Sequence, residues 1–393
     1  MRVPLCDLTR QAAALQPELM AAVARVLASG QFILGPEVEA WEREVAAYLG
    51  ATHAVSVNSG TDALWLALRA LGIGPGDAVL TSAFSFFATV SAIRLTGARP
   101  VFADIDPLTY ALAPEEVRRI LEGRSPVHRR LGIRSQSIKV LLPVHLYGQS
   151  ADLDPLLAVA RERGLLVVED AAQALGAEYH GRKTGTLGHL GCFSLFPTKN
   201  LGAYGDAGLV VTAQGTLAEQ VRLLRTHGSR RRHVHETIGT NSRLDALQAA
   251  LLRVKLPHLD GWIAARRARA AVYDAALSTL PWLEVPARRP DRLHTYHLYT
   301  VRIGGGRRDT LRHMLEERGV ETAVYYPVPL HLQPALQNLG YTAGDFPEAE
   351  RASQELLSLP MFPELTPDEQ SWVVDSMKTL PAAHLVEGSV RRS

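Results

Sequence analysis

The sequence of 393 residues contains only two cysteines and no long apolar run. Cys6 and Cys192 lie far apart and form neither a metal-binding nor a redox spacing, which argues against a disulfide scaffold and fits a reducing compartment. No stretch approaches the roughly 18 apolar residues of a membrane-spanning helix, and the N-terminus lacks the apolar core of a signal peptide. The sequence therefore predicts a cytoplasmic protein that is not held in a membrane.

Excess charge is also missing. The formal net charge is +2, from 42 basic and 40 acidic residues, so no global field draws the chain to nucleic acid or to anionic lipid. With 47% hydrophobic residues the chain can bury a large core, and its length suits two domains. We expect a small, discrete ligand as the partner, and no metal site.

Lysine is the scarcest charged residue. It occurs at positions 139, 183, 199, 255 and 378 only, against 37 arginines (42 minus 5). One of the five, Lys199, stands in the apolar and glycine-rich stretch FSLFPTKNLGAYGDAG (193–208). A lysine in such a setting requires an explanation.

The first two thirds of the chain alternate between short apolar strands and helices. A helix is expected at 34–50, ended by Gly50. Strands are expected at 53–59, 77–84, 99–106, 138–148, 165–173 and 191–198, with helices at 61–72, 87–97 and 153–164. This order predicts an α/β fold in which a mostly parallel sheet lies between helices, with ligands at the carboxyl ends of the strands.

The character of the sequence changes near residue 258. A long helix rich in arginine begins there, and residues 294–326 suggest strand, turn, helix and strand. We expect a large domain at 1–257, a smaller C-terminal α+β domain at 258–385 and a frayed tail at 386–393. Residues 122–137 are polar and basic, which predicts a long surface loop.

The segment NSGTDAL (58–64) lies where the first strand passes into the first helix of the alternation. Ser59, Gly60 and Thr61 would present N–H groups and hydroxyls at a helix N-terminus, which favours an anion such as a phosphate. Ser, Thr and Asp also cap helices routinely, so the segment by itself leaves both interpretations open.

A second signal is the strand LLVVED, which ends in Glu169 and Asp170. Consecutive side chains of a strand point to opposite faces, so only one of the two acids can address a site above the end of the sheet. There it would hold a cation or a protonated nitrogen, although a helix cap or a surface ion pair explains the motif equally well.

Lys199 gives the third signal. Desolvation near apolar and glycine-rich backbone favours the neutral amine that attacks a carbonyl, whereas a solvated loop lysine is the ordinary alternative. A phosphate cradle, an acid for a pyridine nitrogen and an imine-forming lysine together fit one cofactor, pyridoxal 5′-phosphate (PLP). Gln173 could then reach the ring hydroxyl, and Phe86 could stack on the ring, although an aromatic there is more often core.

These segments resemble a known family. NSGTDAL, AFSFFAT, VHLYGQSADLDPL, VEDAAQALGAEYHG, FSLFPTKNLGAYGDAG and IGTNSRLDALQAALLRVKL, in this order, are similar to the DegT/StrS family of PLP-dependent nucleotide-sugar aminotransferases. The similarity covers roughly residues 4 to 380 and so is far more specific than any one motif.

The resemblance implies roles for individual residues. Lys199 matches the Schiff-base lysine, and Asp170 and Gln173 match the residues on the ring nitrogen and ring hydroxyl. The stacking aromatic and the phosphate contacts are matched by Phe86, Gly60, Thr61 and Ser194. Asn241 matches an asparagine that reaches the phosphate of a neighbouring subunit, which implies a homodimer with two shared active sites. Arg243 and His331 resemble residues on the substrate side, although His331 could equally be a loop histidine beside prolines.

The resemblance also implies the reaction. Because position 199 is lysine and not the histidine of the family's sugar dehydratases, we expect transamination from an amino acid, by family habit glutamate, to a nucleotide-linked ketohexose. The motifs stand closer to members that aminate C3, on dTDP-3-keto-6-deoxyhexoses or UDP-3-keto-hexuronates, than to the C4 branch. Such enzymes serve amino sugar and polysaccharide biosynthesis.

Three alternatives were weighed. A C4 aminotransferase or a dehydratase of the same family is the nearest. A Rossmann oxidoreductase predicts a G-x-G-x-x-G turn, which NSGTDAL is not. A silent PLP-fold regulator would not need the lysine, the acid and the cradle. The run Arg230, Arg231, Arg232 could contact the nucleotide diphosphate, but a solvated loop is the commoner meaning of such a run.

Overall fold

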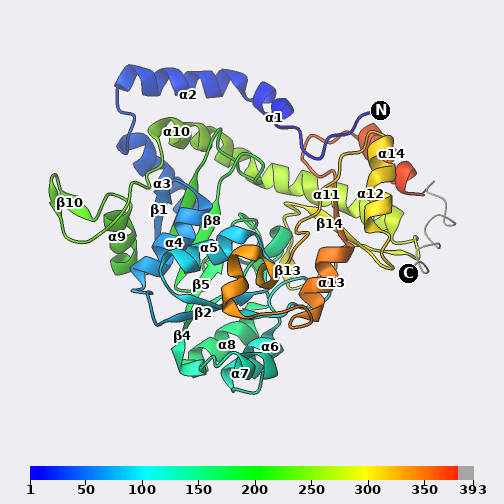
Figure 1. Cartoon of the computed structure of the whole chain (residues 1–393). Coiled ribbons are helices and arrows are strands. Elements are labelled where there is room, and N and C mark those ends of the chain that lie inside the picture. Colours follow the sequence, from blue (N-terminus) through cyan, green and yellow to red (C-terminus); the bar gives the residue numbers. More distant parts are fainter. Residues whose placement is uncertain (379–393) are drawn as a thin grey trace.

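A seven-stranded sheet forms the centre of the N-terminal part of the computed structural model, which describes residues 1–378 (Figure 1). β9 runs antiparallel to both of its neighbours, and the other pairs of adjacent strands are parallel. The predicted mostly parallel sheet is therefore confirmed, although β9 and its reversed direction were not predicted. In spatial order the strands are β1 (His53–Val57), β9 (Gly208–Thr212), β8 (Leu190–Ser194), β5 (Leu166–Asp170), β4 (Ile138–Leu142), β2 (Ala78–Ser82) and β3 (Arg99–Ala103).

Helices cover both faces of this sheet, as a buried parallel sheet requires. Alternate strand residues such as Val168 and Val210 pack on one face with α4 (Gly60–Ala70), α5 (Phe87–Leu95) and α9 (Gly215–Leu224). Their neighbours Val167 and Val211 point to the other face. That face is covered by α3 (Pro36–Leu49), α6 (Pro114–Leu121), α8 (Leu153–Arg163) and α10 (Ala246–Lys255).

The C-terminal part carries a small antiparallel sheet in the order β12–β14–β15. Its elements are α11 (Leu259–Leu277), β12 (Leu283–Glu284), β14 (Tyr299–Ile303), α12 (Arg308–Glu317), α13 (Pro347–Glu355), β15 (Leu356–Leu359) and α14 (Pro367–Lys378). The strand expected near 320–326 is wrong: that segment makes only isolated bridges at Val320 and Ala323, and β15 pairs with β14 instead.

The first residues of the chain contact this C-terminal part. The N–H of Val3 donates to the carbonyl of Gly319 (2.8 Å), and Val3 packs into the same core as Tyr299 and Leu311. In Figure 1 the N-terminus accordingly lies beside α12 and α14. The division at 257/258 stays a prediction, and the expected end of the small domain and the tail at 386–393 lie outside the described residues.

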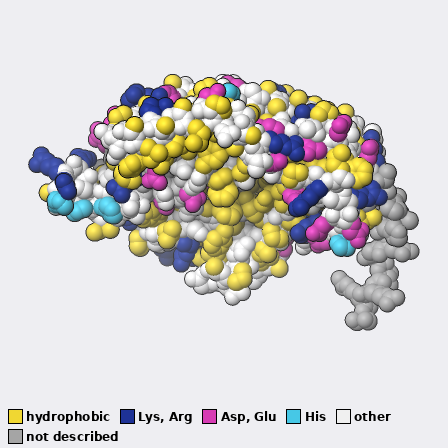
Figure 2. All heavy atoms as spheres, turned by 90° about the horizontal axis from the view of Figure 1, so that it is seen from above, with side chains coloured by type: hydrophobic (Ala, Val, Ile, Leu, Met, Phe, Trp, Pro, Cys, Tyr) yellow, Lys and Arg dark blue, Asp and Glu magenta, His cyan; other side chains and the backbone are white. Residues whose placement is uncertain are grey.

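The remaining elements are peripheral. They are α1 (Leu8–Ala14), α2 (Gln16–Ser29), the short strands β6 (Glu178–Tyr179), β7 (Arg182–Lys183) and β13 (Arg292–Leu293), and a hairpin of β10 (Ser229–Arg231) and β11 (Val234–His235). The hairpin projects from the body in Figure 1, and Figure 2 shows basic and histidine side chains gathered at that end of the molecule. None of the helices in residues 1–378 has the length and apolar character that crossing a membrane requires.

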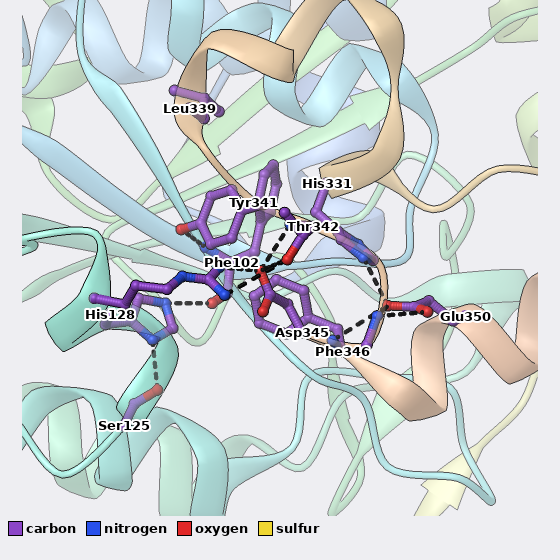
Figure 3. Close-up of polar contacts among 12 residues, drawn as sticks. Phe102, Ser125, His128, His331, Leu339, Tyr341, Thr342, Asp345, Phe346 and Glu350 are labelled. Carbon is purple, nitrogen blue, oxygen red and sulfur yellow. Dashed lines mark hydrogen bonds and ion pairs between the residues drawn. The ribbon is translucent and has the colours of Figure 1, made fainter.

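The prediction of a surface loop at 122–137 is wrong in part. The segment contains α7 (Pro126–Arg130), and His128 is buried, with its ring between the hydroxyl of Ser125 (2.7 Å) and the carbonyl oxygen of Phe102 (2.9 Å) (Figure 3). The polar composition concealed this anchor, because a single buried histidine that satisfies both ring nitrogens leaves no periodic signal in the sequence.

Candidate active site

Lys199 lies in the loop that follows β8, at the carboxyl end of the parallel strands. Its N–H donates to the carbonyl of Phe196 (2.8 Å), which closes a tight turn, and its Nζ lies 3.4 Å from Nε2 of His297. Burial lowers the pKa of Lys199 to about 8, against the opposing charge of Asp170. A substantial fraction of the amine is therefore neutral near physiological pH, as a nucleophile requires.

The two acids that end β5 point to opposite faces of the sheet, as predicted. Asp170 is buried beside Lys199, where its Oδ2 accepts a hydrogen bond from the hydroxyl of Thr89 (2.8 Å) and its Oδ1 accepts one from the N–H of Ala172 (3.2 Å). Burial raises the pKa of Asp170, although these bonds and the charge of Lys199 oppose it. The buried carboxylate therefore has room to gain from a further cationic partner.

Glu169 has a structural task on the opposite face. Its Oε2 accepts from the buried His145 ring (2.9 Å) and its Oε1 accepts from the N–H groups of Leu187 (2.7 Å) and Gly188 (2.6 Å). His145 Nδ1 accepts from the N–H of Ala151 (3.0 Å), so Nε2 carries the proton donated to Glu169. The hydrogen bonds, led by that from His145, lower the pKa of Glu169 against the effect of burial. This network fixes the end of β5 and thus the position of Asp170.

The segment predicted to cradle a phosphate forms a helix N-terminus, and its phosphate contacts stay a prediction. Ser59 caps α4 by accepting from the N–H of Asp62 (3.1 Å), and the N–H groups of Gly60 and Thr61 open the helix. A side chain at Gly60 would place its Cβ 2.6 Å from the Cβ of Ser194 and 3.2 Å from its Oγ. Glycine is therefore required where the helix end and the hydroxyl of Ser194 converge.

Two further predicted residues, Gln173 and Phe86, contact Tyr326. Gln173 accepts from the N–H of Tyr147 (2.7 Å) and donates from Nε2 to the hydroxyl of Tyr326 (2.8 Å). Phe86 keeps 56% of its surface exposed, and its ring centroid lies 5.8 Å from that of Tyr326. Phe86 is therefore available for stacking on a ligand and is not part of the core. Gln173 already bonds Tyr326, so a ligand that contacts Gln173 would also lie beside Tyr326.

One cavity of about 450 Å³ joins these groups. Its wall also includes Leu5, Cys6, Leu359 and Met361, which give it an apolar side. Eight of the predicted site residues line it: Ser59, Gly60, Thr61, Phe86, Asp170, Gln173, Ser194 and Lys199.

Three predicted residues do not line this cavity. Asn241 is exposed and accepts a hydrogen bond from Nε of Arg243 (2.9 Å). His331 is buried, with its Nε2 3.0 Å from Oε1 of Glu350 and its ring against Phe346 (Figure 3). The substrate-side roles of Arg243 and His331, like the reach of Asn241 to a neighbouring subunit, stay predictions.

Sequence reasoning missed Thr89, His297 and Tyr326. Thr89 stands one turn into α5, so a strand–helix junction facing Asp170 could have indicated it. His297 and Tyr326 come from segments about 100 and 130 residues after Lys199, and no local spacing links them to it. Within residues 1–378 no group of three or more histidine, cysteine or acidic residues could hold a metal ion.

The residues present fit PLP. Asp170 is a buried carboxylate that lacks a full cationic partner, Lys199 is a desolvated amine beside it, and the N-terminus of α4 with Ser194 forms a cradle that a single Cβ would fill. A protonated pyridine nitrogen, an aldehyde and a phosphate are the chemical groups that complement these three features.

Comparison with known proteins gives the same result. The model of the DegT/DnrJ/EryC1/StrS aminotransferase family matches residues 13–378. The chain is 46% identical over 379 residues to a pleiotropic regulatory protein of Geobacillus stearothermophilus, covering 96% of this chain and 98% of that one. It is 46% identical over 377 residues to the dTDP-3-amino-3,4,6-trideoxy-alpha-D-glucose transaminase of Streptomyces venezuelae, covering 96% of each chain. The crystal structure of S. venezuelae DesV in complex with a ketimine intermediate superposes with a TM-score of 0.90 at 46% identity, covering 96% of this chain and 98% of that one.

Proposed function

This chain belongs to the DegT/DnrJ/EryC1/StrS aminotransferase family, and on that premise we propose that it moves an amino group from an amino acid to the C3 keto group of a nucleotide-linked hexose. Its cofactor is PLP, and glutamate is the expected donor. The observation that supports this proposal most strongly is that one cavity contains a lysine with a pKa of about 8, a buried carboxylate and a candidate phosphate cradle.

Residues of this chain can bind the cofactor and transfer the proton that a transamination requires. When bound, PLP contributes an aldehyde that condenses with amines and a ring that accepts the electron pair released at the substrate carbon. Asp170 would hold a proton on the ring nitrogen, and the N-terminus of α4 with Ser194 would bind the phosphate. Lys199 would bond the aldehyde in the resting enzyme and, once its amine is free, would serve as the base that moves the proton to and from the substrate carbon.

Lysine at position 199 favours amino transfer over the dehydration that histidine-bearing family members perform. C3 is supported by a relative of 46% identity that is named a dTDP-3-amino-3,4,6-trideoxyglucose transaminase. The regulator alternative is favoured by the names of relatives such as the Geobacillus protein. The complete set of Lys199, Asp170 and cradle still favours an enzyme, because a silent regulator needs none of these.

We further propose a homodimer with shared sites, because the cavity has too few cations for its substrates. A nucleotide sugar carries a diphosphate and glutamate carries two carboxylates. The described lining includes the acids Asp170 and Asp206, whereas its titratable basic groups are Lys199 and His297. We expect further positive charge from a partner subunit: the exposed hairpin with Arg230–Arg232 suits this role, and the exposed neutral amide of Asn241 can donate a hydrogen bond to a phosphate.

Mixed dimers test the shared site. Asn241→Ala and Lys199→Ala subunits are each expected to be inactive as homodimers, whereas a mixture recovers about a quarter of wild-type activity, since one site in half of the dimers is intact. No recovery in mixtures whose exchange is verified by tagged pull-down would contradict sharing.

Product analysis tests the reaction itself. The protein is incubated with glutamate and a panel of dTDP- and UDP-linked 3-keto and 4-keto hexoses, and each product is identified by mass and NMR. We expect an amino group at C3 with stoichiometric release of 2-oxoglutarate. Amination at C4 alone, or loss of a hydroxyl without amino transfer, would overturn the proposal.

A cytoplasmic location belongs to this proposal. Support comes from Cys6 and Cys192, both of which are unpaired thiols in the structure.

A further inference from the structure

We propose that His297 is a positioning residue for Lys199: its neutral imidazole accepts a hydrogen bond from the lysine amine and holds that amine in the cavity whenever its nitrogen is free. This inference rests on the proposed function, because it assigns His297 to the step in which Lys199 acts as a base. The observation behind it is the 3.4 Å separation between Nζ of Lys199 and Nε2 of His297.

The segment that carries His297 is held by hydrogen bonds to Tyr147 and Gly148, which follow β4 of the large sheet. Thr295 N–H donates to the carbonyl of Gly148 (2.9 Å), and Leu298 N–H donates to the carbonyl of Tyr147 (3.3 Å). A Cβ at Gly148 would lie 2.9 Å from the backbone nitrogen of His297, so this close approach requires glycine. Tyr147 is also the residue whose N–H binds Gln173, so one turn positions both His297 and a predicted cofactor contact.

The surroundings of His297 keep its ring neutral. The ring is buried, with 7% of the residue exposed, and it lines the cavity. Burial holds the pKa of His297 well below its ordinary range, and the charges of Lys199 and Arg266 act in the same direction. Nη1 of Arg266 also lies 3.4 Å from the backbone carbonyl oxygen of His297, so positive groups face this residue from two elements, while Asp170 faces Lys199.

A neutral imidazole has one donor and one acceptor nitrogen. Next to the ammonium form of Lys199, which has donors only, Nε2 must be the acceptor, so the proton then resides on Nδ1. Nδ1 of His297 is buried and has no hydrogen-bond partner within residues 1–378. An unsatisfied buried donor costs stability and calls for a functional reason, which the contact with Lys199 supplies.

The contact has a chemical consequence for the free lysine. A neutral amine has two N–H bonds and one lone pair. If one N–H donates to His297, the lone pair stays available for the proton of the substrate carbon, and the amine cannot turn away from it. His297 therefore acts through Lys199 and does not itself transfer the proton.

A purely structural histidine nearby offers the contrast. His294 accepts a hydrogen bond from the N–H of Tyr296 (2.9 Å) and stacks on that ring at a centroid distance of 3.9 Å. It does not line the cavity. Because His294 lies three positions earlier in the same segment, His294→Leu is a matched control for His297→Leu.

The test compares His297→Leu, which removes the acceptor, with His297→Gln, whose amide oxygen can still accept, and with His294→Leu. Each protein is loaded with pyridoxamine 5′-phosphate, which leaves Lys199 free. The pH midpoint of acetylation of Lys199 is then followed by peptide mapping. Without the acceptor the buried ammonium loses a stabilising bond, so we expect the midpoint in His297→Leu to fall by about one pH unit.

Kinetics give the second readout. We expect kcat of His297→Leu to fall about 10- to 100-fold with KM for both substrates within about twofold, and His297→Gln to recover most of kcat. An unchanged or raised midpoint in His297→Leu, or kinetics of His297→Leu equal to those of His294→Leu, would overturn the proposal. If His297→Leu does not fold, the decision passes to His297→Gln. Near-wild-type values there support the proposal, and a 10- to 100-fold loss of kcat in His297→Gln contradicts it.

Failure of this inference is separable from failure of the proposed function. Borohydride treatment of the wild-type enzyme loaded with PLP, followed by peptide mapping, shows whether Lys199 bonds the cofactor. An untagged Lys199 overturns the function, whereas a tagged Lys199 with unaltered His297 variants overturns the positioning role alone.

Discussion

Replacing Lys199 with methionine should abolish turnover and yet stabilise the cofactor-free protein near neutral pH. The reason lies in the lowered pKa of Lys199: the cavity destabilises the ammonium form relative to water. A methionine fills a similar volume beside the apolar wall and carries no charge to desolvate. Function and stability are therefore expected to oppose each other at this residue.

The pKa gives both the size and the sign of the effect. A fall from 10.5 to about 8 spans about 2.5 pH units (10.5 minus 8), and at about 1.4 kcal/mol per unit the cost of the ammonium is up to about 3 kcal/mol. Because the folded pKa is the lower one, the unfolded chain binds more protons between pH 8 and 10.5, so the cost is full below pH 8 and disappears above 10.5. At pH 9.5 only about 1 kcal/mol of it should remain.

Urea denaturation of the cofactor-free protein at one fixed protomer concentration measures this effect. The free energy of unfolding of Lys199→Met should exceed that of wild type by about 2 to 3 kcal/mol at pH 7, and by about 1 kcal/mol at pH 9.5. Lys139→Met, at an exposed position of β4, serves as the control and should show no gain that depends on pH. A destabilised Lys199→Met, or a gain equal at both pH values, would refute the desolvation argument.

Three further predictions concern this cavity and the Glu169 network on the opposite face of the sheet. Asp170→Asn should lower kcat about 100- to 1000-fold, which corresponds to about 3 to 4 kcal/mol, because a buried neutral amide would no longer hold a proton on the ring nitrogen; turnover within a factor of three would exclude this role. Gly60→Ala should weaken retention of the cofactor at least tenfold in an absorbance titration, since its Cβ would meet Ser194 at 2.6 Å; unaltered affinity would mean that the cradle can relax. Glu169→Gln should reduce the free energy of unfolding by about 2 to 4 kcal/mol, because the charge-assisted bonds to His145 and to three backbone N–H groups weaken, and a melting temperature equal to that of wild type would contradict this.

Local patterns were sufficient for most of the sheet. The strands β1, β2, β3, β4, β5 and β8 and the helices α3, α4, α5 and α8 lie where apolar runs and helical periodicity place them. β9 was not predicted, because GLVVT continues a glycine-rich stretch and nothing local indicates its reversed direction. The strand expected near 320–326 is missing because Ala323 makes only a single bridge, to Ser358 of β15, whereas β15 itself pairs with β14.

The candidate chemistry of the site could be predicted wherever a single short segment contains the residues concerned. Lys199 in its glycine-rich loop, Asp170 at a strand end and Gly60 at a helix start each follow from residue type and the nearest element boundary. The choice between Glu169 and Asp170 could not be predicted from local sequence. Alternation along a strand indicates that one of the two acids faces the site, but it does not indicate which one. The network of Glu169 with His145 decides it.

The sequence alone identified the candidate nucleophile, acid and phosphate cradle, because each of them is encoded within a few neighbouring residues. Only the tertiary structure decided what surrounds them: His297 reaches Lys199 from 98 positions away, Thr89 reaches Asp170 from 81, and His331 turns toward Glu350 and not toward the cavity. Desolvation and hydrogen-bond direction depend on contacts between distant segments, and these are the quantities that shift a pKa and orient an amine.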